Sequence, residues 1–135
     1  MYHHILIPLA LDHDTDFRNT LETSRLLLAE GGIITLVAVV EDVPSYVAEY
    51  ATVRPSHDIR EQLKDRLVNL SEGHGDTEIA ILAGKPGVVI PDLAAETDAD
   101  LIVIGSHRPG IEDYFLGSTA SRVVRRAPCA VLVMR

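Results

Sequence analysis

The sequence predicts an α/β fold: a single doubly wound, parallel five-stranded sheet with helices on both faces, of the Rossmann-like type. Five short runs rich in Ile, Val and Leu are apolar at nearly every position, which is typical of strands covered on both faces. Helical patterns separate these runs, and a strand–helix alternation closed by a strand indicates a parallel sheet. A length of 135 residues suits one domain, which we expect to span residues 1–135.

The expected strands read "ILIPLAL", "IITLVAVV", "TEIAIL", "LIVIG" and "CAVLVM", and they start at Ile5, Ile33, Thr77, Leu101 and Cys129. The second strand is followed by residues 41–55, which form a long connection for a strand–helix link. Such a loop can cover a site, although a merely variable loop is an equal alternative.

The first two helices are indicated by apolar positions three and four residues apart. The stripe of the first helix consists of Phe17, Leu21, Ser24 and Leu28, and we expect it to end at Gly31 and Gly32. The stripe of the second consists of Ile59, Leu63, Leu67 and Leu70, with Ser56 placed to cap it.

The third helix is expected over residues 88–97, with Pro91 in its first turn, where a missing N–H group costs little. The fourth helix presents an expected inner face of Ala120, Val123, Val124 and Ala127. Arg122, Arg125 and Arg126 of this helix are interpreted as a solvated face near the helix end that favours cations.

Charge and composition exclude several classes of partner. Twelve basic against twenty acidic residues give a net charge of -8, which disfavours nucleic acid and anionic membranes. No apolar run approaches the ~20 residues that span a bilayer, and no signal-peptide pattern opens the chain. The single Cys129 fits a reducing compartment and an inert, buried thiol. We therefore expect a cytoplasmic protein without membrane insertion.

The segment between the fourth and fifth strands points to an anion. Ligands of open α/β sheets bind at the carboxyl ends of the strands where the winding reverses, here expected between the first and fourth strands. Gly117, Ser118 and Thr119 open the fourth helix, whose free amides and dipole attract negative charge. Gly105 allows a close approach, and His107 and Arg108 supply donors nearby. Turn chemistry, with Ser118 as a simple helix cap, is the competing interpretation.

Other motifs fit less well. The segment "GKPG" from Gly84 lacks the upstream glycine of a P-loop and has Pro86 where Ser or Thr belongs, and no G-x-G-x-x-G follows the first strand. Asp12, Asp14 and Asp16 resemble the start of a phosphotransferase motif, but Asp16 replaces its Thr or Val. Helix-capping charges are the simpler interpretation. His3 and His4 point to opposite faces of a strand, so no metal site is expected.

Along essentially its whole length the chain resembles the universal stress protein family. The resemblance rests on "GSH" from Gly105, "LGST" from Leu116, the ending "APCAVLVMR", "ILIP" near the start and "GKPG". It implies an adenine nucleotide, ATP or AMP, with Mg²⁺. It also implies a homodimer in the cytoplasm, paired through the last strand from Cys129 to Met134, whose apolar edge would otherwise lie open.

Carried onto this sequence, the resemblance implies that adenine lies near Pro8, Leu9 and the backbone of Val39. It places ribose and phosphates against Ile104, Gly105, His107, Gly117, Ser118 and Thr119. Two departures affect this set. Ala10 stands where the family has an Asp, and Arg108 replaces the second glycine of Gly-x-x-Gly, with Gly110 available to restore the turn.

These features together predict a nucleotide-binding module of the stress response that acts through a protein partner. No general base or nucleophile is expected beside the phosphates, so turnover is expected to be slow or absent. Two alternatives stay open. One is a phosphotransferase or nucleotide hydrolase using Asp12, Asp14 and Asp16. The other is a dimeric interaction module that binds no nucleotide.

Overall fold

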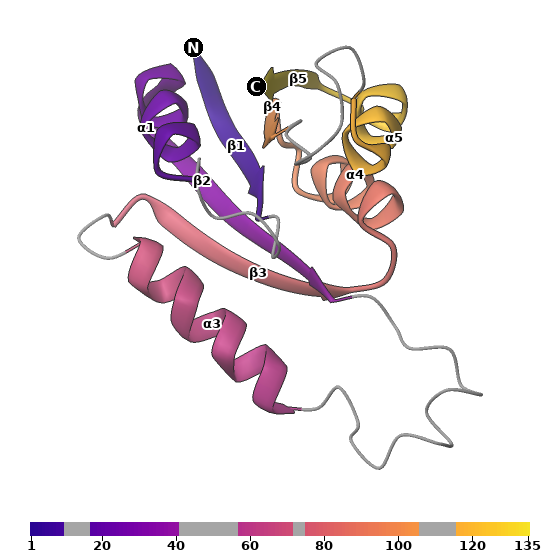
Figure 1. Ribbon diagram of the computed structural model, residues 1–135. Helices are drawn as coiled ribbons and strands as arrows, with labels where there is room; N and C mark the ends of the chain where they lie inside the picture. The colour runs from indigo at the N-terminus through magenta and orange to yellow at the C-terminus, as the bar shows by residue number, and fades with distance from the viewer. Residues whose placement is uncertain (10–16, 41–56, 72–74, 106–115) are drawn as a thin grey trace.

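The computed structural model describes residues 1–9, 17–40, 57–71, 75–105 and 116–135 (Figure 1). Strands and helices alternate along them, as the sequence predicts. The elements are β1 (Tyr2–Pro8), α1 (Phe17–Leu27), β2 (Leu28–Val40), α3 (His57–Ser71), β3 (Thr77–Ala83), α4 (Pro86–Glu96), β4 (Leu101–Gly105), α5 (Ser118–Arg126) and β5 (Ala130–Met134). No helix in these ranges is long and apolar enough to cross a membrane.

The five strands form one parallel sheet in the order β3-β2-β1-β4-β5. The chain winds outward from β1 to β3 on one side and from β4 to β5 on the other, so the direction reverses between β1 and β4. This confirms the predicted switch point. It also confirms that the last strand lies at an outer edge of the sheet.

Helices cover both faces of the sheet, and each face has its own core (Figure 1). Ile5 and Ile7 of β1 are fully buried on the face that packs against α1 and α3. Leu6, between them, is fully buried on the opposite face, against α4 and α5. Alternate side chains of one strand therefore enter different cores, which explains why the strand is apolar at every position.

The boundary between α1 and β2 differs from the sequence prediction. We expected the helix to continue through Leu28 to the glycine pair, but it ends at Leu27 and β2 begins at Leu28. Leu28 already pairs with Tyr2 of β1, and the register then shifts before His4 pairs with Ile33. Gly31, with φ of 79°, lies in the segment that accommodates this irregularity. Pairing with β1 thus outweighs the helical periodicity.

Two expectations about the later helices are also wrong. Pro86 is the first residue of α4, so Pro91 lies inside the helix rather than in its first turn. In α5, Ala120 and Val123 are buried, but Val124 is 44% exposed. The buried face of this helix is therefore narrower than the four apolar positions of its sequence suggest. Ala127 follows as the half-buried C-cap.

Candidate functional site

The carboxyl ends of β1 and β4 lie beside each other at the switch point. Their pairing is in register between Ile5 and Leu101 and between Leu6 and Ile102. Continued along both strands, this register brings Pro8, the last residue of β1, level with Ile104, the next to last residue of β4. Immediately after β1, the backbone N–H of Leu9 donates to the carbonyl of Val37 at 2.7 Å, which holds the chain against β2 as it leaves the sheet.

The structure brings the described adenine- and ribose-site candidates to this edge. Pro8 ends β1, Val39 is next to last in β2, and Ile104 and Gly105 end β4. No more than 9% of Leu9, Val39 or Ile104 is exposed, so each of these residues offers only a small surface at this edge. A Cβ added at Gly105 would meet no heavy atom within 4 Å, so the space beside this glycine is open.

Four predicted binding residues lie outside the described residues: Ala10, His107, Arg108 and Gly110. The same holds for the alternative catalytic cluster of Asp12, Asp14 and Asp16 and for the long connection of residues 41–55. Within the described ranges, no group of three or more His, Cys, Asp or Glu side chains is arranged to hold a metal ion.

The amino-terminal end of α5 has no side-chain cap. Gly117 is the N-cap residue, and its carbonyl accepts the first helical hydrogen bond, from the N–H of Ser121 at 2.9 Å. Ser118 is therefore the first residue of the helix, so the interpretation of Ser118 as a simple cap is wrong. The amides of Ser118, Thr119 and Ala120 precede the first helical donor, and no cap side chain satisfies them.

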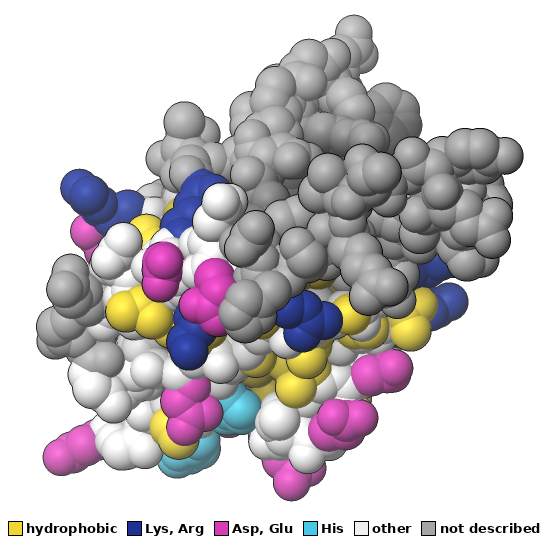
Figure 2. All heavy atoms as spheres, turned by 90° about the horizontal axis from the view of Figure 1, so that it is seen from below, with side chains coloured by type: hydrophobic (Ala, Val, Ile, Leu, Met, Phe, Trp, Pro, Cys, Tyr) yellow, Lys and Arg dark blue, Asp and Glu magenta, His cyan; other side chains and the backbone are white. Residues whose placement is uncertain are grey.

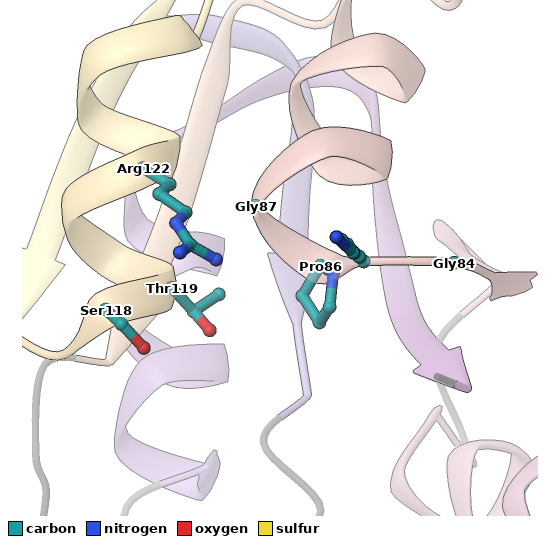
Figure 3. Close-up of a pocket in the computed structure, with 7 residues that line it drawn as sticks. Gly84, Pro86, Gly87, Ser118, Thr119 and Arg122 are labelled. Atoms are coloured by element: carbon teal, nitrogen blue, oxygen red, sulfur yellow. The ribbon is translucent and has the colours of Figure 1, made fainter. Parts of the chain in front are cut away.

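A pocket of about 380 Å³ opens between the amino-terminal ends of α4 and α5. It is lined by residues 84–87 at the turn from β3 into α4, and by Ser118, Thr119 and Arg122 of α5. Figure 3 shows Thr119 and Arg122 extending from α5 toward Pro86 and Gly87, while the Ser118 hydroxyl lies at the start of the helix. Two helix starts, two hydroxyls and two cations thus face a common volume.

Arg122 lines the pocket, a role that the sequence analysis did not assign to it. Its side chain is exposed, as are those of Arg125 and Arg126, which agrees with the predicted solvated face. The signal that could have placed Arg122 at the pocket is helical spacing, because a residue three after Thr119 and four after Ser118 shares their face. The "GKPG" segment also lines the pocket, even though it is not a P-loop. Gly84 there has φ of 134°, a conformation that favours glycine where β3 turns into α4.

The charge around the pocket differs in sign from that of the whole chain. Its described lining contains Lys85 and Arg122 and no carboxylate, although the net charge of the chain is -8. Elsewhere the charges are mixed: the described part of the face in Figure 2 carries acidic and basic side chains interspersed with hydrophobic ones. The pocket is therefore a local positive site on an acidic protein, suited to a small anion.

Comparisons with known proteins agree with this architecture. The model of the universal stress protein family matches residues 1–135. Universal stress protein A homolog 2 of Coxiella burnetii is 34% identical over 145 aligned residues, covering 99% of this chain and 95% of that protein. The match to universal stress protein G of Salmonella typhimurium is shorter: it is 35% identical over 79 residues, and the chain spans only 56% of that relative's length.

Solved structures share the fold at lower identity. A universal stress protein from Archaeoglobus fulgidus in complex with dAMP superposes with a TM-score of 0.67 at 24% identity, covering 99% of this chain and 98% of that one. Another universal stress protein, in complex with cAMP, has a TM-score of 0.64 at 23% identity, covering 99% and 97%.

Proposed function

The chain belongs to the universal stress protein family, and we propose that it binds an adenine nucleotide at the carboxyl ends of β1 and β4. The observation that supports this most directly is the uncapped start of α5 beside the pocket. Gly117 leaves the helix amides open, and Ser118 and Thr119 add hydroxyl donors. A phosphate placed there accepts hydrogen bonds from these groups and is stabilised by the helix dipole.

The base and ribose extend from this phosphate position toward β1 and β2. The backbone at Pro8, Leu9 and Val39 offers polar groups to adenine, and Ile104 and Gly105 border the ribose. Two solved relatives hold dAMP and cAMP, both adenine nucleotides, which supports the choice of base. ATP and AMP are the proposed ligands, and His107, Arg108 and Gly110 are proposed to complete the phosphate contacts.

Mg²⁺ is proposed to arrive with ATP. The described pocket gives the ion hydroxyl oxygens from Ser118 and Thr119 but no carboxylate. Mg²⁺ commonly keeps several waters and is held largely by substrate phosphates, so these hydroxyls are compatible with such an ion. The described lining contains no His, Asp or Glu that could act as a general base toward the Ser118 and Thr119 hydroxyls. This supports a binding module with little or no turnover, which we propose to act on a partner protein in the cytoplasm.

We propose that the protein works as a homodimer through β5. This strand is the outer edge of the sheet, and its residues from Val131 to Met134 are half-buried. Pairing about a twofold axis, through the segment from Cys129 to Met134, would cover both edges.

The test of nucleotide binding is mass spectrometry of small molecules released by denaturing the purified protein, combined with calorimetric titration of the nucleotide-free protein. An adenine nucleotide in the released fraction, or saturable binding of ATP or AMP, supports the proposal. An empty fraction together with no heat of binding for either nucleotide contradicts it and favours an interaction module without a nucleotide.

A further inference from the structure

The sheet has a second outer edge at β3. In the described sheet no strand lies beyond β3, and Figure 1 shows this strand at the outer side of the sheet with α3 alongside it. Its seven residues pair with β2 in a continuous register from Thr77 to Ala83. Proteins usually protect such an edge with Pro, a bulge or charged side chains. β3 contains no Pro, and its only charged residue is Glu78.

Two hydrogen bonds at the ends of β3 show which of its backbone groups point outward. The carbonyl of Asp76 accepts from the N–H of Ile34 at 2.9 Å, and the N–H of Gly84 donates to the carbonyl of Val40 at 2.9 Å. Successive strand residues direct their N–H and C=O groups to opposite sides, so the even-numbered residues between these two bonds face β2. The odd-numbered residues therefore direct their N–H and C=O groups away from the sheet, and they are Thr77, Ile79, Ile81 and Ala83.

This outer row of backbone groups fits an extended chain. Free N–H and C=O groups at every second residue are the ladder with which an added strand pairs. Thr77, Ile79 and Ile81 are only partly buried, and Ala83 is exposed. An added strand would therefore meet both the hydrogen-bonding groups and some apolar surface.

The position of α3 argues against a second copy of this chain as the occupant. α3 packs mainly on β3 and less on β2. Antiparallel pairing of two β3 strands about a twofold axis would place both α3 helices on the same face of the joined sheet. Paired strands lie about 4.8 Å apart, whereas the axes of packed helices need about 8–10 Å. The two helices would overlap, but an extended segment without a covering helix avoids this overlap.

Charge further restricts the chemistry of this segment. Glu78 is exposed on β3, Asp76 directly precedes the strand, and the chain has a net charge of -8. Opposite charges on neighbouring strands stabilise a sheet, and like charges destabilise it. We propose that the outer edge of β3 binds, by strand addition, an extended segment of a partner protein that has Lys or Arg at alternate positions. This inference goes beyond the proposed function and does not require a bound nucleotide.

The test is amide hydrogen exchange, followed by NMR on the nucleotide-free protein, with a peptide of alternating Lys and Val, as long as β3, as the probe. Without peptide, the even-numbered amides of β3 should exchange slowly and the outer amides of Ile79 and Ile81 quickly. Saturating peptide should slow exchange at Ile79 and Ile81 by about tenfold or more, because an added strand protects them. Slow exchange of these two amides without peptide, or no change on adding it, overturns the inference.

A control peptide separates strand pairing from simple attraction between opposite charges. The same sequence N-methylated at every residue keeps its positive charge but has no backbone N–H to donate. It should bind about tenfold more weakly than the unmodified peptide, since several hydrogen bonds are lost together. Equal binding of the two peptides would assign the effect to charge alone and overturn the inference.

Two substitutions at one position test the edge itself. Ala83→Pro removes an outer N–H and should weaken peptide binding about fivefold, the loss expected for one hydrogen bond. Ala83→Val keeps the N–H and should bind the peptide as wild type does. Equal affinities in the two variants contradict the proposed pairing. Sedimentation checks the other occupant: assemblies larger than a dimer that Ala83→Pro disrupts would assign the edge to a second copy and overturn the inference.

Discussion

The carboxylate of Asp100 accepts a hydrogen bond from the backbone N–H of His4 at 2.9 Å, at the end of the sheet opposite the pocket. Its other oxygen accepts from the N–H of His3 at 2.8 Å. The backbone N–H of Asp100 in turn donates to the carbonyl of His4 at 3.0 Å. Asp100, the residue directly before β4, thus holds the start of β1. The winding direction of the sheet reverses between these two neighbouring strands.

Asp100→Asn should destabilise the fold by about 1–2 kcal/mol, since an amide cannot accept two N–H groups as a carboxylate does. Burial raises the pKa of Asp100, but hydrogen bonds from the His3, His4 and Asp100 amides and the nearby His3 ring outweigh it, so the net pKa is lowered. The folded state therefore favours the ionised form. Its stabilisation is complete above the pKa of the unfolded chain and is lost as pH falls through the folded pKa.

Urea denaturation at several pH values measures this effect. The difference in unfolding free energy between wild type and Asp100→Asn should be largest near neutral pH and should shrink toward acid. Asp92→Asn is the control, because Asp92 is an exposed residue of α4. A difference that is independent of pH would show that the charge of Asp100 is not what stabilises the strand ends.

Cys129 should react slowly with alkylating reagents at neutral pH. Burial, followed by the negative charge of Asp100, raises the pKa of its thiol, so little reactive thiolate is present. Asp100→Asn should speed alkylation, because removing the negative charge lowers the pKa of the thiol. The rate of iodoacetamide labelling, followed by mass spectrometry, checks both statements. Labelling of the folded wild-type protein as fast as that of a free thiol would contradict them.

Gly117→Val should weaken ATP binding at least tenfold, because a branched side chain stands where a phosphate meets the α5 amides. The fold should survive, since φ of -57° and ψ of 157° at Gly117 are accessible to any residue. Gly75→Val, at an exposed turn with open space around it, is the matched control. Calorimetry that gives unchanged ATP affinity in folded Gly117→Val would remove this glycine from the site.

Val133→Lys should convert a dimer into monomers or aggregates. Val133 pairs with Ile104 in register on the inner side of β5, and the outer side of this strand is the edge of the sheet. A lysine there adds charge to the proposed twofold interface, whereas Arg126→Glu, on α5, should leave the dimer intact. Sedimentation at micromolar concentration checks this, and a monomeric wild type would rule out the β5 dimer.

Most of the fold could be predicted because strands covered on both faces have an unmistakable apolar sequence. The alternation of elements predicted a parallel sheet with its switch point between the first and fourth strands, and this placed Gly105 and Gly117 at the same edge of the sheet. The end of α1 could not be predicted, because Leu28 fits the apolar stripe of a helix as well as it fits a strand. Its pairing with Tyr2 of β1 places it in the strand. Tertiary pairing then overrides local periodicity.

The phosphate side of the site was predicted only in part. Gly117, Ser118 and Thr119 are recognisable because they precede a helix, which is a local feature of the sequence. Arg122 and Gly87 become a pair only when α4 packs on α5, since 35 residues separate them along the chain, as their numbers show. Helical spacing places Arg122 on the face of Ser118 and Thr119, but no local pattern reports its contact with Gly87, which emerged from the structure alone.

The central claim, that a nucleotide phosphate binds at the start of α5, is tested most directly by amide chemical shifts in ¹⁵N-labelled protein titrated with ATP. We predict saturable shifts at Gly105, Gly117, Ser118 and Thr119, at the carboxyl ends of the strands and the start of α5. The amides of His3, His4 and Asp100, at the opposite end of the sheet, should stay in place. Shifts confined to that opposite end, or no saturable shift at Ser118 and Thr119, would contradict the claim.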